Sequence, residues 1–175
     1  MHDTKVKLAA DIERHTLTVL VDNEAGVLAR VVGLFSGRGY NIESLTVAEV
    51  DAMARTSRIT IVTSGTPAVI EQIETQLRRL VPTHKVTNWT SAKAGIEREM
   101  ALVKVAGTGE KRVEALRMAD AFRARPVDTT QASFVFEITG APSKIDSFVD
   151  LMRPLGLVEI SRTGVAAISR GPDAM

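Results

Sequence analysis

The chain has 175 residues, of which 45% are hydrophobic and 25% charged, with a formal net charge of +1 and no cysteine. This length suits one domain or two small ones, and either arrangement can bury a core. The small net charge argues against nucleic acid or anionic membrane as partners, and the lack of cysteine excludes disulfides, thiolate metal sites and cysteine nucleophiles.

The N-terminal residues 1–14 mix acidic and basic side chains with few apolar ones, which predicts a frayed or loosely helical leader. No apolar core of a secretory signal follows it. No apolar run approaches the ~20 residues that span a bilayer. We therefore expect a cytoplasmic protein without a membrane partner.

The first half of the chain alternates predicted strands with two amphipathic helices. Segments rich in β-branched residues predict strands over 15–21, 41–50, 57–64 and 84–90. Apolar residues at helical spacing predict helices over 27–35 and 67–81. Thr66 and Pro67 are typical of a helix N-terminus, and Pro82 ends this helix. The resulting order is β-α-β-β-α-β.

The small, polar residues 91–95 predict a linker, after which the same order returns. Strands are expected over 99–105, 126–130, 133–139 and 157–161, and a further short strand over 165–169. Helices are expected over 110–124 and 142–152, the first facing inward through Val113, Leu116, Ala119 and Phe122. The fold class is therefore α+β, with two ferredoxin-like βαββαβ domains. We place their limits at 15–91 and 98–171.

The two central segments of the first domain carry apolar residues that we assign to both faces of the sheet. These residues are Ile42, Leu45, Val47, Ile59, Ile61 and Val62. Two helices can cover only one face, and an isolated small domain would leave the other face in water. This predicts a homodimer formed through the first domain.

A polar turn, Asp22-Asn23-Glu24-Ala25-Gly26, joins the first strand to the first helix. A helix N-terminus has unpaired N–H groups and partial positive charge, so a carboxylate can bind there. Gly26 would let a ligand approach the backbone, and Asn23 can both donate and accept, which suits an amino acid. Asn41 follows the far end of the helix and could reach the turn of a second subunit. From these residues alone, a plain Asp or Asn helix cap is the stronger alternative.

Other candidate sites are weaker. Gly107-x-Gly109 opens a helix after a strand, but it lacks the third glycine of a dinucleotide site, so a plain turn is favoured. The histidines His2, His15 and His84 lack metal-ligand spacing, and no catalytic triad or carboxylate pair can be assembled. Surface positions at turns or strand starts are expected for Glu24, Glu43 and Asp51. A solvated basic face, with partner docking as the alternative, is expected for Arg112, Arg117, Arg123 and Arg125.

Two longer stretches resemble a known family. Residues 22–30 (DNEAGVLAR) resemble the ACT-domain signature, in which an acidic or amide residue and a glycine precede Val-Leu. Residues 33–47 (GLFSGRGYNIESLTV) resemble the small regulatory subunit of acetolactate synthase (acetohydroxyacid synthase). Further matches lie at 57–62, 98–105, 162–166 and 169–171, so the resemblance extends over roughly 16–171.

The resemblance implies an ACT domain that binds valine at a dimer interface, in a chain that has no catalysis of its own. The partner would be the catalytic large subunit of acetolactate synthase, a transferase of branched-chain amino-acid biosynthesis that carries ThDP, Mg and FAD. The small subunit would activate it and transmit feedback inhibition. The residues that would hold valine are Asn23, Gly26, Val27, Leu28, Asn41 and Ile42. Ala29 stands where relatives often have serine, so no hydroxyl is available there.

Other functions remain open on this evidence. A stand-alone ACT-type amino-acid sensor with another partner would use the same turn. RNA binding shares the βαββαβ order but needs exposed aromatics on the central strands, whereas aromatic residues are only 4% of this chain. An independent enzyme is the least favoured. The preference among valine, leucine and isoleucine rests on roughly one methylene, about 1–3 kcal/mol, so an aliphatic effector is expected without a ranking.

Overall fold

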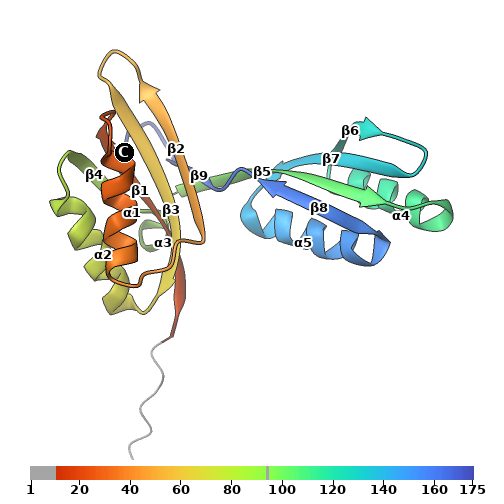
Figure 1. The fold of residues 1–175 in the computed structure, drawn as a ribbon, viewed down its shortest axis with the longest axis horizontal. Helices are drawn as coiled ribbons and strands as arrows, with labels where there is room; N and C mark the ends of the chain where they lie inside the picture. The colour runs from red at the N-terminus through yellow and green to blue at the C-terminus, as the bar shows by residue number, and fades with distance from the viewer. Residues whose placement is uncertain (1–10, 94) are drawn as a thin grey trace, which may run out of the picture. The chain divides into compact units, whose positions relative to one another are not determined.

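The computed structural model describes residues 11–93 and 95–175, which form two compact units (Figure 1). The first unit runs as far as Gly95 and also includes Ser169–Met175, and the second is Ile96–Ile168. Each has an antiparallel sheet with two long helices in the βαββαβ order, which confirms the predicted α+β fold. Residues 169–171, which the sequence assigned to the second domain, group with the first unit. Within the described ranges, no helix is long and apolar enough to cross a bilayer.

The sheet of the first unit has the strand order β2-β3-β1-β4. Its strands are β1 (Glu13–Asp22), β2 (Ser44–Asp51), β3 (Thr56–Gly65) and β4 (Thr83–Asn88). The central strands β1 and β3 pair along their full length, from Glu13 opposite Gly65 to Asp22 opposite Thr56. At one end of this order, β2 pairs with β3, with Leu45 opposite Ile61.

Most of the predicted leader lies outside the described residues, but its end is part of the sheet. Glu13 and Arg14 belong to β1, so the strand begins two residues earlier than predicted. The reason is that β3 continues to Gly65 and supplies pairing partners for both residues.

Two helices cover one face of this sheet, α1 (Val27–Gly37) and α2 (Pro67–Arg79) (Figure 1). The Val69 N–H donates to Thr66 Oγ1 over 3.4 Å, which confirms the predicted helix start with Pro67 in the first turn. Between helices and sheet lies a core of fully buried side chains that include Leu17, Val19, Val31, Phe35, Ile61, Ile73 and Leu77.

The second face of this sheet is rich in threonine, so the prediction of apolar residues on both faces was wrong. Leu45 of β2 lies opposite Ile61 of β3, and both contribute to the core under the helices. Of the apolar residues assigned to these strands, Val62 alone faces the other way. The remaining positions on that face of β1, β2 and β3 include Thr16, Thr18, Thr46 and Thr60. This face is therefore not a large apolar surface exposed to water, and it does not support the predicted dimer.

The segment that follows β4 forms a short helix, α3 (Trp89–Ala92), where the sequence predicted a strand end and a linker. Asn88 begins this helix by accepting a hydrogen bond from the Ser91 N–H over 3.1 Å. The buried Trp89 indole N–H donates to Thr18 Oγ1 over 2.7 Å. This contact and the Asn88 cap turn the chain out of the sheet, so the aromatic ring covers part of the threonine-rich face.

The second unit has the strand order β6-β7-β5-β8, and β9 also pairs with β5. Its strands are β5 (Gly95–Ala106), β6 (Arg125–Thr129), β7 (Ser133–Gly140), β8 (Leu157–Arg162) and β9 (Ala166–Ser169). Its helices are α4 (Gly109–Ala121), α5 (Pro142–Met152) and the 3-10 turn η1 (Arg153–Leu155). The strand predicted over 133–139 is present as β7, whose Phe134, Phe136 and Ile138 are buried together and pack against Phe148 of α5.

Helix α4 faces the core through Ala119 and Phe122, as predicted, but not through Val113 and Leu116. Val113 and Leu116 are 49% and 40% exposed, whereas Ala115 and Ala119 are buried. Ala115, Met118, Ala119 and Phe122 follow i, i+3, i+4, i+7 spacing, and small alanines let the helix approach the sheet closely. For the first part of the helix the prediction followed the larger aliphatic side chains, which are partly exposed, and missed Ala115.

Candidate functional site

The predicted ligand turn lies where β1 ends and α1 begins. Gly26 is the residue before the helix and has φ +87° and ψ −7°, in the left-handed region. There glycine avoids the ~1–2 kcal/mol that most other residues would lose. A Cβ added to Gly26 would meet no atom within 4 Å, so the space beside the turn is open.

No Asp or Asn side chain caps α1, which removes the plain helix-cap interpretation. Gly26 occupies the cap position, and α1 has no side-chain cap hydrogen bond. The Asp22 carboxylate instead contacts Nε2 of His84 on β4 at 2.5 Å. The Asn23 side chain is exposed and makes no hydrogen bond within the described ranges.

The first turn of α1 offers free backbone donors beside the open space. Val27 is buried and its N–H donates to Glu24 O over 3.4 Å. The N–H groups of Leu28 and Ala29 point out of the first turn, where α-helix geometry provides no partner, and they bond to no other described residue. The partial positive charge of the helix end favours an anion at these donors.

The turn is held in place from both sides by its own unit. The Asn23 N–H donates to Arg55 O over 2.6 Å, and the Asp22 N–H donates to Pro82 O over 3.2 Å. From α1, Arg30 Nη1 donates to Val81 O over 2.9 Å. These contacts link the turn to the β2–β3 hairpin and to the α2–β4 loop, so its donors are preorganised.

The other two predicted site residues lie beyond the opposite end of α1. This helix has 11 residues, which corresponds to about 16 Å. The Asn41 side chain is exposed, and its backbone carbonyl accepts from Thr63 Oγ1 over 2.6 Å. Ile42 packs against the core. One chain therefore brings Asn23, Gly26, Val27 and Leu28 together at one end of α1 and leaves Asn41 and Ile42 at the other.

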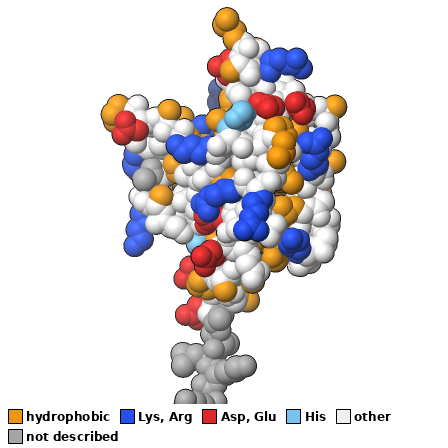
Figure 2. Space-filling view, turned by 90° about the vertical axis from the view of Figure 1, so that its left-hand side faces the viewer, with side chains coloured by type: hydrophobic (Ala, Val, Ile, Leu, Met, Phe, Trp, Pro, Cys, Tyr) orange, Lys and Arg blue, Asp and Glu red, His pale blue; other side chains and the backbone are white. Residues whose placement is uncertain are grey.

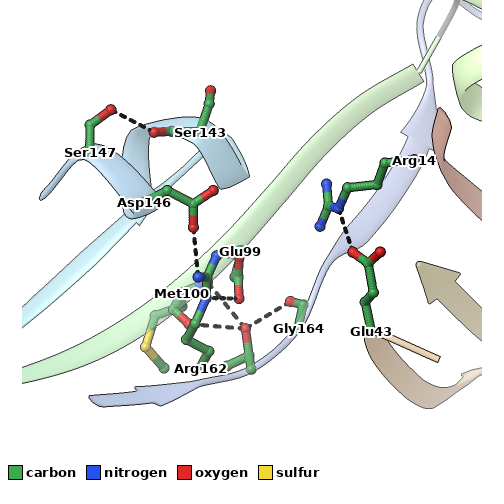
Figure 3. A network of polar contacts seen from close by, with 10 residues as sticks. Arg14, Glu43, Glu99, Met100, Ser143, Asp146, Ser147, Arg162 and Gly164 are labelled. Atoms are coloured by element: carbon green, nitrogen blue, oxygen red, sulfur yellow. Dashed lines mark hydrogen bonds and ion pairs between the residues drawn. The ribbon is translucent and has the colours of Figure 1, made fainter. Parts of the chain in front are cut away.

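Glu43, which the sequence assigned to the surface, anchors the segment that carries Asn41. Its carboxylate accepts from Arg14 Nε over 2.9 Å (Figure 3). It also accepts from Ser64 Oγ. The Ser64 hydrogen bond, with Arg14 beside it, holds the pKa of Glu43 below its ordinary value although partial burial raises it. Its partners lie 21 and 29 residues away in the chain, and no local motif indicates such contacts.

A second charged cluster, also missed by sequence reasoning, lies in the second unit. Arg162 of β8 donates two hydrogen bonds to Glu99 of β5, over 2.7 and 2.6 Å, and one to Asp146 of α5 over 2.7 Å (Figure 3). Glu99 is only 4% exposed, and its hydrogen bonds raise the pKa of Arg162. Each charged group of the cluster is paired with an opposite charge, so the cluster links β5, α5 and β8. It offers no unpaired acid or base for catalysis.

The remaining candidates have structural roles or mixed charge. Arg112 lies over the Phe134 ring at 3.9 Å, and Arg125 pairs with Glu137 at 2.9 Å. A hollow of about 740 Å³ beside Gly109 has Lys111 and Arg117 in its lining, but also two glutamates. This mixture disfavours phosphate. On the side of the first unit that bears α1 and α2, acidic and basic side chains are likewise interspersed (Figure 2).

The described histidines are engaged within the protein, and His2 lies outside the described residues. Buried His15 contacts Asn88 Oδ1 through Nδ1 and Glu13 Oε2 through Nε2, each at 3.2 Å. In the ranges 11–93 and 95–175, no group of three or more His, Asp or Glu could hold a metal ion.

Comparison with known proteins connects this geometry to a family. Residues 17–85 match the family described as "AHAS small subunit-like ACT domain", and residues 98–171 match "Small subunit of acetolactate synthase". The chain belongs to the acetolactate synthase small-subunit family. The predicted ACT domain and the predicted family are thereby confirmed.

Relatives resemble the chain over nearly its full length. The probable acetolactate synthase small subunit of Archaeoglobus fulgidus is 47% identical over 90% of this chain and 98% of its own. The isozyme 3 small subunit of Escherichia coli is 44% identical over 93% and 99%, respectively. The crystal structure of the small subunit from Thermotoga maritima has a TM-score of 0.79 and 38% identity, over 92% of this chain and 99% of its own. The chain is therefore a small, regulatory-type subunit with an ACT domain.

Proposed function

We propose that this chain is the regulatory subunit of an acetolactate synthase, which binds and activates a catalytic large subunit in the cytoplasm. Valine binds between two copies of its ACT domain and transmits feedback inhibition of branched-chain amino-acid biosynthesis. The observation that supports this proposal most strongly is the N-terminus of α1. It has no side-chain cap, and the free N–H groups of Leu28 and Ala29 lie beside the open space at Gly26. ThDP, Mg and FAD belong to the large subunit in this proposal.

The chemistry of the turn suits the two ends of an amino acid. The N–H groups of Leu28 and Ala29 would donate to the carboxylate, and the helix end favours its negative charge. The Asn23 amide can supply both a donor and an acceptor. Burial of the isopropyl group would contribute about 2 kcal/mol at ~0.8 kcal/mol per carbon. An aliphatic effector is therefore favoured over a polar one.

The separation of Asn23 from Asn41 along α1 supports a dimeric site. A two-fold axis between two copies would bring the turn of one subunit to the Asn41 end of the other, and would form the same pocket twice. The β2 side chains Val47 and Val50 are exposed. Exposed apolar side chains of this kind would favour contact with a second copy.

Two measurements on the purified full-length chain test this proposal. Titration calorimetry with valine should give one binding curve, and sedimentation should give a dimer at micromolar concentration. A tagged chain in extract of its source cell should retain a ThDP-dependent large subunit. Valine binding with retention of a different protein would instead support the stand-alone sensor. A monomer that binds no valine would exclude both.

A further inference from the structure

We infer that Glu43 is a positioning residue for the amino-acid site, and that it holds the Asn41 segment in its binding shape together with Thr63 and Ser64. The inference rests on the proposed function, because it assigns a role at the same site. None of these three side chains needs to touch the effector. Their role is to fix the backbone from which the Asn41 side chain projects.

The segment between α1 and β2 is anchored on both sides of Asn41. Before it, the Tyr40 N–H donates to Phe35 O over 2.9 Å, and the Tyr40 hydroxyl donates to Gln72 Oε1 over 3.3 Å. At Asn41 itself, the carbonyl accepts from Thr63 Oγ1 over 2.6 Å. The exposed Asn41 amide bonds to no other described group, so it is available to a ligand or a second subunit.

After Asn41, the anchor is Glu43, which is bound through its backbone and both carboxylate oxygens. Its N–H donates to Val62 O over 2.8 Å, Oε2 accepts from Arg14 Nε, and Oε1 accepts from Ser64 Oγ. Thr63 and Ser64 are neighbours on β3, and Arg14 of β1 pairs with Ser64 in the β1–β3 ladder. The anchors therefore come from one rigid place, the end of the β1–β3 ladder.

The carboxylate is suited to this role because it can accept two hydrogen bonds at once. The carboxylate is ionised at neutral pH, and hydrogen bonds to an ionised acceptor are the stronger kind. A glutamine side chain keeps the shape but carries no charge and has one acceptor oxygen, so the ion pair with Arg14 is lost and the Ser64 hydroxyl must accept from the NH₂ group instead of donating. Glu43→Gln should therefore loosen the segment without creating a cavity.

The test is valine affinity by titration calorimetry on the full-length chain. Losing one charged hydrogen bond should weaken valine binding about 5- to 10-fold in Glu43→Gln. Thr63→Val should weaken it similarly, and Thr63→Ser, which keeps the donating hydroxyl, should restore wild-type affinity. The matched control is Glu159→Gln, which removes another carboxylate whose pKa is lowered, by Lys104 in the second unit. It should bind valine like wild type.

The outcomes separate this inference from the proposed function. Wild-type affinity in both Glu43→Gln and Thr63→Val would overturn the inference alone. A loss in Thr63→Ser equal to that in Thr63→Val would overturn it as well, because a general packing effect would then suffice. No valine binding by the wild-type chain would overturn the proposed function, and the inference with it.

Discussion

Two substitutions of one glycine separate charge from shape at the proposed amino-acid site. Gly26 has a left-handed backbone and open space around its Cβ position. Asn and Asp are the residues other than glycine that adopt this backbone most readily. Gly26→Asn and Gly26→Asp therefore place side chains of nearly equal shape at the turn, and only the aspartate adds a negative charge.

The size of the charge effect follows from the position of the turn. An aspartate carboxylate about 4 Å from the carboxylate of valine would repel it by ~1 kcal/mol in water and by ~4 kcal/mol near a protein surface. Valine binding should thus be about 5-fold to several hundred-fold weaker in Gly26→Asp than in Gly26→Asn. The free energy of unfolding should instead be higher in Gly26→Asp than in Gly26→Asn, because a negative charge at a helix N-terminus stabilises the helix by about 0.3–1 kcal/mol.

Calorimetric valine titrations and urea unfolding of both variants measure the two effects. The expected result is a weaker binder that is at least as stable as the asparagine variant. If the two variants bind valine equally well, the carboxylate does not lie at the N-terminus of α1, and the reasoning fails. If Gly26→Asp is instead the less stable of the two, the loss of binding could not be assigned to charge.

Three further predictions concern stability. Above pH 4.5, Glu43→Gln should unfold at a lower urea concentration than wild type, and this difference should vanish at lower pH. The reason is that the lowered pKa of Glu43 stabilises the fold only while the group is ionised. Equal urea unfolding curves of the two proteins at pH 7 would contradict this. Glu99→Gln should lose about 1–3 kcal/mol of unfolding free energy, since it breaks the buried pair with Arg162. Asp146→Asn changes a side chain that is 58% exposed, so it should lose about 0–1 kcal/mol. Urea titrations in which both variants lose the same unfolding free energy would contradict the role assigned to burial. Ile61→Ala should lose about 2–5 kcal/mol by calorimetric melting, because the side chain is fully buried, and a loss below 1 kcal/mol would place it outside the core.

Secondary structure followed from local patterns where side-chain type and burial agree. The helix start at Thr66 and the strand over 133–139 are such cases. The exceptions arose from tertiary contacts. Trp89 has a high strand propensity, but its hydrogen bond to Thr18 and the Asn88 cap favour a short helix.

The buried residues in the first part of α4 and the faces of the first sheet were missed for a common reason. Hydrophobicity alone ranks Val113 and Leu116 above alanine, but close packing against the sheet favours the small Ala115 and Ala119. In β2 and β3, apolar residues were assigned without the register. Only the pairing shows that one face is largely threonine.

The part of the candidate site that lies within one turn of the chain was predictable from the sequence. Asn23 and Gly26 are near neighbours in sequence, and the turn they form could be read from the strand before it and the helix after it. Asn41 and its anchor Glu43 depend on contacts to β1 and β3 and, in the proposed site, on a second chain. Such long-range contacts leave no local pattern, and the ion pair between Glu99 and Arg162, 63 residues apart, was missed for the same reason.

The most direct test of the regulatory role is the rate of acetolactate synthesis by the catalytic large subunit from the same source, titrated with this chain with and without valine. We predict that the chain raises the rate to a plateau at a fixed subunit ratio, and that valine lowers that plateau in wild type but much less in Gly26→Asp. A rate unaffected by the chain, with or without valine, would contradict the account.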